Sequence, residues 1–179
     1  PSPNGSASRS AWATRTFGRS TVLRRVCRTA SELKSTAPTE KARYAVKGEF
    51  SFDRPAGWRL SDAWGDSPPT LYLSRERAGA GKPVTVVLTR YDAGRPGWQP
   101  LEEAFAAERE WRGAKDAGSG SVAGRAARFS AVAGESGTAY VPAGRGRYYA
   151  FVYSAPPEAY AAHEPAFTAL LSSLELEAQ

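Results

Sequence analysis

The sequence is poor in the residues on which enzymes and metal sites most often depend. It has one cysteine, Cys27, and one histidine, His163, among 179 residues. A single cysteine excludes a disulfide within the chain and a zinc site built from several cysteines. A Ser-His-Asp triad would have to use His163, and no serine lies in the elbow sequence typical of such nucleophiles. We therefore predict no catalytic residues, and His163 is left as the only candidate histidine base.

Long apolar runs and cofactor motifs are also missing. No stretch of 18 apolar residues occurs, so no membrane-spanning helix is predicted. The stretch AGAGKP (78–83) has Glu76 and Pro83 where a phosphate-binding loop needs Gly and Ser or Thr. The glycines of GSGSVAG (118–124) are spaced one residue too widely for dinucleotide binding. There is no calcium loop of the EF-hand type. We therefore predict no cofactor and no metal.

Positive charge is confined to the start of the chain. Residues 1–47 carry ten Lys or Arg and two Asp or Glu, whereas residues 48–179 carry fourteen and sixteen. A nucleic-acid-binding domain needs its basic residues on a folded face. The near-neutral balance of residues 48–179 therefore argues against sequence-specific binding of nucleic acid by a folded domain.

The basic segment has the composition of a disordered leader. Residues 1–31 contain six Arg, six Ser and no acidic residue, and such a segment buries too little apolar surface to offset its ordering entropy. We interpret residues 1–47 as a leader and 48–179 as a single domain. Three roles for the leader stay open: an organelle transit peptide, a segment that binds RNA or anionic lipid through its arginines, or an inert extension.

From residue 48 the pattern becomes that of a folded sheet. In GEFSFDRPAGWRL (48–60), Phe50 and Phe52 alternate with polar residues, as in a half-buried strand. Pro55 and Gly57 end that strand, and Trp58 provides an apolar anchor after the turn. The sequence predicts a hairpin that turns near Gly124, and further strands at 70–75, 83–91, 138–142 and 147–155.

Two helices accompany these strands. Residues 99–115 predict a helix on which Leu101, Phe105, Glu108 and Trp111 share a face, while its many glutamates form a solvated surface. We expect Pro165 to begin a second helix, which places His163 in the turn before it. Strands and helices do not alternate regularly. The predicted fold class is therefore α+β, a sandwich of one sheet with helices.

Two tryptophans lie in loops rather than in predicted strands. Trp64 is in DAWGDSPP and Trp98 is in GRPGWQP, both rich in Gly and Pro. An aromatic residue on a loop with few apolar neighbours is a candidate anchor for a binding partner. The alternative is that each tryptophan folds back and pins its loop to the domain. We predict Trp64 and Trp98 as partner-binding residues and leave the second interpretation open.

The pattern of residues 48–176 resembles the PsbP-like family, which includes the extrinsic PsbP proteins of photosystem II and related bacterial domains. The resemblance rests on GEFSFDRPAGW, VTVVLTRY, LEEAFAAEREW, SVAGRAARF and the Tyr-rich strand before the last helix. It implies an α/β/α sandwich with a mainly antiparallel sheet. It also implies a non-enzymatic accessory, assembly or binding protein whose partner is another protein or a membrane-associated complex.

Location and function keep their alternatives at this stage. A cleaved leader implies an organelle, a thylakoid lumen or a bacterial envelope, and an intact one implies the cytoplasm. Two rival functions remain: a small hydrolase that uses His163, and binding of RNA or an anionic surface through the N-terminal arginines.

Overall fold

The computed structural model describes residues 42–76 and 81–177, all within the unit that spans residues 35–179. These residues form two antiparallel sheets. The larger has seven strands in the order β3-β4-β5-β9-β8-β7-β6, and the smaller has three in the order β1-β2-β10. The strands are β1 (Ala42–Val46), β2 (Phe50–Arg54), β3 (Arg59–Ala63), β4 (Thr70–Arg75), β5 (Val84–Tyr91), β6 (Lys115–Val122), β7 (Arg125–Val132), β8 (Ser136–Gly144), β9 (Arg147–Ser154) and β10 (Glu175–Leu176).

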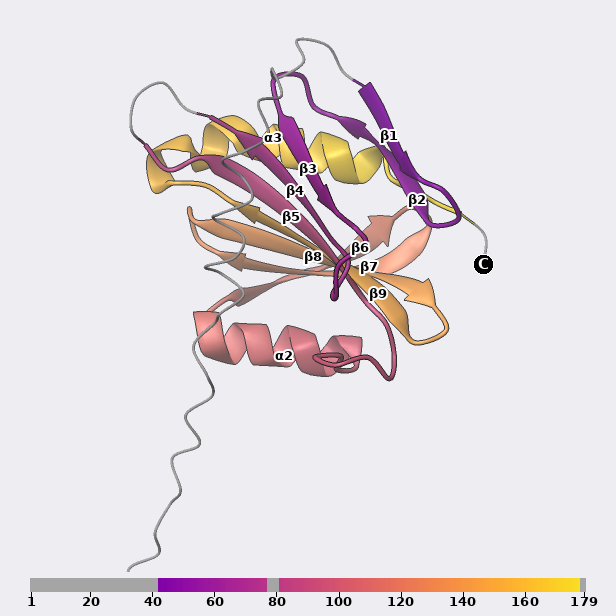
Figure 1. Cartoon of the computed structure of the whole chain (residues 1–179). Helices are drawn as coiled ribbons and strands as arrows, with labels where there is room; N and C mark the ends of the chain where they lie inside the picture. The colour runs from indigo at the N-terminus through magenta and orange to yellow at the C-terminus, as the bar shows by residue number, and fades with distance from the viewer. Residues whose placement is uncertain (1–41, 77–80, 178–179) are drawn as a thin grey trace, which may run out of the picture. The chain divides into compact units, whose positions relative to one another are not determined.

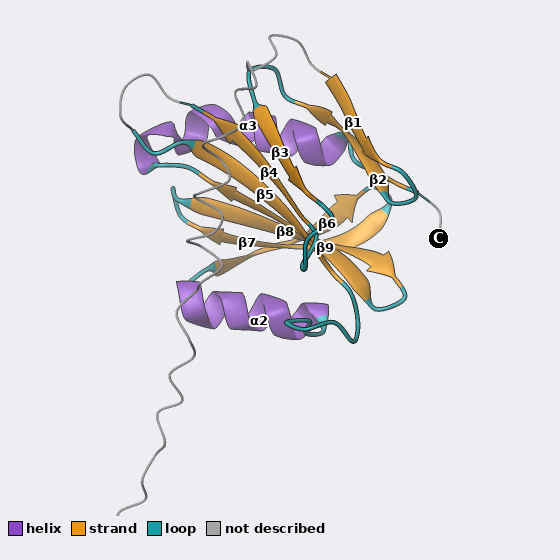
Figure 2. Cartoon of the chain, in the orientation of Figure 1, coloured by secondary structure: helices purple, strands orange, loops and turns teal. Residues whose placement is uncertain are grey.

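Two helices cover opposite faces of the seven-stranded sheet (Figures 1 and 2). Helix α2 (Leu101–Arg112) packs on β7 and β8, and helix α3 (Pro157–Ser172) packs on β2, β5 and β9. The predicted α/β/α sandwich with an antiparallel sheet is therefore confirmed.

The central strand β9 supplies side chains to both layers of the core. Tyr149, Phe151 and Tyr153 alternate toward α3, where they join the buried cluster that contains Phe167 and Leu170. Tyr148 points the other way and packs with Phe105 of α2. The alternation follows from the period of two in a strand, and aromatic side chains on both faces explain why β9 is so deeply buried.

Two hairpins of the large sheet have the shortest turns. Ala123 and Gly124 link β6 to β7 with φ values of 49° and 71°, and Arg145 and Gly146 link β8 to β9 with φ values of 51° and 71°. Positive φ at both central residues gives the twist that matches two antiparallel strands. The hairpin predicted near Gly124 is confirmed, and a second one of the same kind follows it.

The folded domain begins earlier than the sequence indicated. Ala42–Val46 form β1, which pairs antiparallel with β2 from Ala42 opposite Arg54 to Val46 opposite Phe50. Residues 42–46 therefore belong to the sheet and not to the leader, which corrects the boundary predicted at residue 48. Arg43 explains the error, because its charge is satisfied by Asp53 and Glu175 rather than left in a basic tail. The rest of the predicted leader, 1–41, lies outside the described residues.

The last helix also begins earlier than expected. It starts at Pro157, a position at which the missing N–H has no intrahelical role, and it runs through Pro165. Pro165 costs the helix the hydrogen bond to the carbonyl group of Ala161, which is an exposed residue. His163 is therefore a half-buried helical residue and does not lie in a turn.

The inward face of α2 is narrower than predicted. Phe105 is buried, but Trp111 is 84% exposed, because 3.6 residues per turn place it about a third of a turn around the helix from Phe105. Glu108, by contrast, does not belong to a solvated acidic surface, because its side chain is 11% exposed. Its carboxylate accepts hydrogen bonds from the hydroxyl groups of Ser130 (2.6 Å), Thr138 (2.8 Å) and Tyr140 (2.8 Å). Helix and sheet are thus joined by a polar contact in the middle of their interface.

Buried tyrosines make the stability of the domain sensitive to alkali. Burial raises the pKa of both Tyr148 and Tyr153 to about 12, against an ordinary value of about 10. A raised folded-state pKa contributes stability that is complete below about pH 10 and is lost as the pH rises toward about 12. We expect the free energy of unfolding in guanidinium to fall steeply between these values. A Tyr153→Phe variant should lose less stability over the same interval, and an equal loss would contradict this assignment.

Candidate partner-binding site

The two loop tryptophans line the same cleft at one end of the large sheet. One wall is the loop 64–69, between β3 and β4, and the other is the loop 92–100, between β5 and α2. The loops meet because β4 pairs with β5 and the backbone N–H of Arg90 donates to the carbonyl group of Pro69 at 3.0 Å. The cleft has a volume of about 270 Å³, and its lining includes Trp64, Pro68, Arg90, Tyr91 and Trp98.

Trp64 folds back onto the core. Its ring meets Phe50 edge-on at 5.0 Å and stacks near Tyr149 at 6.3 Å, between ring centroids. The guanidinium carbon of Arg90 lies 5.6 Å from the centroid of the indole, in range of a cation–π interaction. The indole N–H is buried and, among the described residues, has no hydrogen-bond partner. The indole of Trp64 is therefore fixed by its contacts where it lines the cleft.

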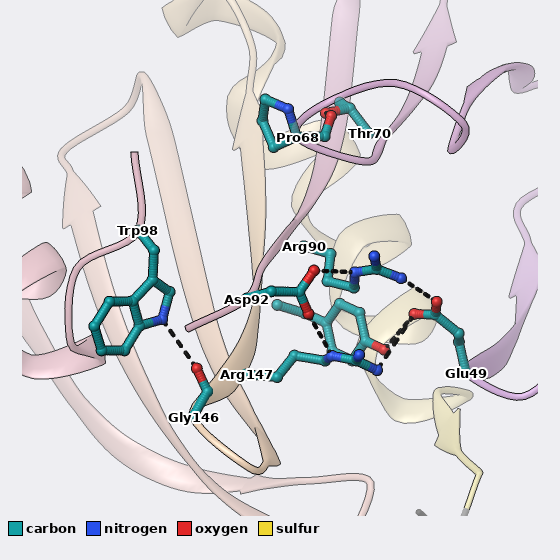
Figure 3. A network of polar contacts seen from close by, with 9 residues as sticks. Glu49, Pro68, Thr70, Arg90, Asp92, Trp98, Gly146 and Arg147 are labelled. Carbon is teal, nitrogen blue, oxygen red and sulfur yellow. Dashed lines mark hydrogen bonds and ion pairs between the residues drawn. The ribbon is translucent and has the colours of Figure 1, made fainter. Parts of the chain in front are cut away.

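Trp98 is fixed by a different set of contacts. Two successive turns shape its loop, with the N–H of Arg95 donating to Asp92 and the N–H of Trp98 donating to Arg95, both at 3.1 Å. The indole N–H donates to the carbonyl group of Gly146 in the β8–β9 turn at 2.9 Å (Figure 3). Its ring packs beside the cluster around Phe105. Both tryptophans therefore pin their loops, and both also form the cleft.

An ion-pair network joins the segments that form the cleft. Asp92 accepts a hydrogen bond from Arg90 Nε at 2.9 Å on one oxygen and from Arg147 Nε at 2.6 Å on the other (Figure 3). Arg90 also pairs with Glu49, whose second carboxylate oxygen accepts the Tyr149 hydroxyl at 2.9 Å. Burial, followed by the hydrogen bond to Glu49, raises the pKa of Tyr149. Two carboxylates and two guanidinium groups balance, so the network holds the loops without leaving net charge.

The sequence could not have located this network. Glu49 lies on the turn before β2, Arg90 and Asp92 lie at the end of β5, and Arg147 begins β9. They meet only because Tyr91 is in register with Tyr148 and the small sheet packs over that end. No local spacing links residues 41 and 55 positions apart.

The lining of the cleft combines apolar and charged side chains. The cleft walls include aromatic rings, prolines, the paired charges of Arg90 and Asp92 and the side chains of Asp66 and Arg95, and His163 is not among the residues that line it. Within residues 42–76 and 81–177, no group of three or more His, Cys, Asp or Glu side chains is placed to hold a metal ion. In the same described part of the chain, no helix is long and apolar enough to cross a membrane.

A second cleft was not predicted from the sequence. It has a volume of about 290 Å³ and lies between α3 and the hairpin β6–β7, where its lining includes Val122, Phe129, Tyr160, Phe167 and Leu171. It is beside β6, whose residues are exposed except for Val122. The sequence signal was weak here because β6 is rich in Gly and Ser and lacks apolar alternation.

Comparison with known proteins places the fold. No family model matches the chain, and neither does any curated protein. The solution structure of cyanobacterial PsbP (CyanoP) from Synechocystis matches with a TM-score of 0.50 and 14% identity over 78% of this chain and 94% of that one. The fold is PsbP-like.

Two other solved structures align over a similar extent. LpqN of Mycobacterium tuberculosis, described as involved in cell envelope biogenesis, gives a TM-score of 0.49 and 14% identity over 78% of this chain and 91% of that one. PA94 of Pseudomonas aeruginosa, a protein of unknown function described as a putative regulator, gives a TM-score of 0.48 and 16% identity over 78% of this chain and 99% of that one. At these identities the likeness concerns the backbone. The resemblance inferred from the sequence is confirmed for the PsbP-like fold by the match to CyanoP.

Proposed function

We propose that this PsbP-like domain is a non-catalytic accessory protein that binds another protein through the cleft between Trp64 and Trp98. The observation that carries the proposal is that both tryptophans, which lie far apart in the sequence, line one cleft. Tryptophan is enriched among the residues that dominate binding energy in protein interfaces. The aromatic rings are already held by Phe50, Arg90 and Gly146, so little side-chain entropy is lost when a partner binds.

The walls of the cleft fit a polypeptide. Pro68, Pro69 and Pro96 line it together with the two indoles, and aromatic-lined grooves are typical of domains that hold extended peptide segments. The volume of about 270 Å³ admits one or two side chains of a partner rather than a whole cofactor. The fold likeness to CyanoP supports an accessory role only in general terms.

Site-specific photo-crosslinking tests this function. Gln99 is exposed and adjoins Trp98, whereas Ala133 is exposed in the turn at the opposite end of the sheet. We expect p-benzoylphenylalanine at Gln99, in the cells that make the protein, to give a discrete adduct with another protein. The same group at Ala133 should not give it. A Trp98→Ala substitution should weaken recovery of that adduct by about thirtyfold, the effect of losing an interface anchor.

The control is the fold itself. The Trp98→Ala variant should keep the far-ultraviolet circular dichroism of the parent, because the indole is only half buried and β5 and α2 remain intact. If Gln99 gives no adduct in a folded protein, or if the adduct is unchanged by Trp98→Ala, the proposed function is wrong.

A further inference from the structure

We propose that the partner bound at this cleft presents carboxylate side chains, and that Lys47, Arg95, Arg125 and Arg145 receive them. This inference rests on the proposed function and adds the chemical class of the partner, an acidic polypeptide segment. It concerns the loop end of the sandwich, defined here as the turns 47–49, 64–69, 92–100, 123–125 and 145–147.

Strand pairing brings these turns together. Tyr91 at the end of β5 is opposite Tyr148 at the start of β9, and β7 runs antiparallel to β8, with Arg128 opposite Tyr140 in the middle of β8, so that the β6–β7 and β8–β9 turns are at the same end of the sheet. The contact of Glu49 with Arg90 brings the β1–β2 turn to the same end. The turns that follow Asp92 and Arg145 also touch, through the hydrogen bond from Trp98 to Gly146.

The cations of the loop end and the adjoining Arg90 of β5 fall into two groups. Arg90 and Arg147 are half-buried and are neutralised by Glu49 and Asp92. The second group, Lys47, Arg95, Arg125 and Arg145, is exposed, and none of its members forms an ion pair with an acidic residue of the described chain.

The unpaired cations outnumber the free acids on these turns. Apart from the network carboxylates, the acidic residue on the five turns is Asp66, and the exposed Glu177 adds a carboxylate that accepts the backbone N–H of Gly48 at 2.9 Å. Residues 48–179 as a whole carry a slight excess of acids, sixteen against fourteen Lys or Arg. A positive end on a near-neutral domain attracts and orients an acidic partner.

Arg145 also occupies a backbone position that disfavours its side chain. Its φ of 51° at the first central position of the β8–β9 turn is a left-handed conformation in which Asn, Asp and Gly are preferred. Arginine there strains the turn and places a cation at its tip. Ala123 has the equivalent position in the β6–β7 turn, with a φ of 49° and no charge, so it provides a matched control.

The distribution of charge favours a peptide over a nucleic acid. A nucleic acid has phosphates along its whole length and needs a continuous basic face. Here the four cations lie on separate turns, and Asp66 and Asp92 line the cleft itself. An acidic segment with spaced carboxylates and apolar side chains matches both the separated cations and the aromatic walls.

The test uses the full chain and a fluorescein-labelled peptide in which Glu alternates with Trp and Pro. The control peptide is the same except that Gln replaces every Glu. We expect the Glu peptide to bind at least about tenfold more tightly than the Gln peptide. The double variant Arg95→Gln/Arg145→Gln should weaken the Glu peptide by about tenfold. Lys82→Gln/Lys115→Gln, which loses the same charge at the opposite end, should change it less than about twofold.

A second variant separates binding from folding. Arg145→Asn should raise the unfolding midpoint because the turn is relieved, and yet weaken the Glu peptide. Ala123→Asn should also raise the midpoint but leave the peptide affinity unchanged. The arginines of residues 1–31 are the same in all variants, so their contribution cancels in each comparison.

Three results would overturn the inference. These are equal binding of the Glu and Gln peptides, equal losses in the two double variants, or tighter, Arg95-dependent binding of a single-stranded RNA. The Gln99 adduct distinguishes failure of the acidic-partner inference from failure of the proposed function. If it persists in Arg95→Gln/Arg145→Gln, the cleft binds a protein by other contacts and only the acidic partner is wrong. If it never forms, the proposed function itself fails.

Discussion

Replacing Glu49 by alanine is expected to destabilise the domain by about 3 kcal/mol. Glu49 is 14% exposed and receives Arg90 and the hydroxyl group of Tyr149. Its removal leaves two guanidinium groups, of Arg90 and Arg147, to share the single carboxylate of Asp92 in a poorly solvated place. Breaking a buried ion pair by removing one partner costs about 3–5 kcal/mol because the remaining charge is uncompensated.

Urea unfolding monitored by tryptophan fluorescence measures this loss. Asp53→Ala is the matched control, because Asp53 pairs with Arg43 on side chains that are 39% and 49% exposed. It should lower the free energy of unfolding by less than about 1 kcal/mol, as is typical of surface ion pairs. Losses of the same size in both variants would show that the network does not hold the loop end together.

Replacing Glu108 by alanine is expected to cost a similar amount, about 3 kcal/mol, at the other polar centre of the fold. The hydroxyl groups of Ser130, Thr138 and Tyr140 all donate to this carboxylate, and each buried donor left without an acceptor costs about 1 kcal/mol or more. The carboxylate also pairs with Arg112, one helical turn later. Helix α2 would then rest on the sheet mainly through Phe105 and its neighbours.

Glu110→Ala on the same helix is the control for this substitution. Glu110 is exposed, so its variant should differ from the parent by less than about 0.5 kcal/mol. Thermal unfolding followed by circular dichroism is sufficient to compare the two. If Glu108→Ala is as stable as Glu110→Ala, the three hydroxyl groups find water, and the contact contributes nothing to the packing of α2.

The strands were the part of the fold that local sequence could predict. Residues 70–75 match β4, and 147–155 match β9 with one residue to spare, because alternation and β-branched or aromatic residues are properties of short segments. The same holds for the turn at Gly124, where the backbone requires φ values that glycine tolerates.

The errors share a physical cause, which is that distant residues decided the outcome. From composition, Arg43 was assigned to a basic tail, but in the fold it pairs with Asp53 and Glu175. Glu108 was assigned to the solvated surface, but in the fold it accepts hydrogen bonds from three hydroxyl groups of β7 and β8. A prediction from composition treats charge as solvated by default, and it fails where the tertiary fold supplies a partner.

The candidate site was half predicted. Trp64 and Trp98 were recognised as unusual from their Gly- and Pro-rich surroundings, but the sequence did not indicate that they line one cleft. That depends on the pairing of β4 with β5 and on the contact between Trp98 and Gly146, 48 residues away. Their role in binding a partner stays a prediction.

The strand order has a consequence for how the chain folds during synthesis. Strands β3, β4 and β5 leave the ribosome as a meander, but the inner edge of β5 pairs only with β9, about sixty residues later. Until β9 emerges, Val84, Val86 and Leu88 lack the strand that completes their layer. The small sheet is completed later still, because its strand β10 (Glu175–Leu176), which pairs with β2, is almost the last segment to be synthesised. Nascent chains therefore expose an unpaired strand edge, of the kind that promotes aggregation, until β9 is made.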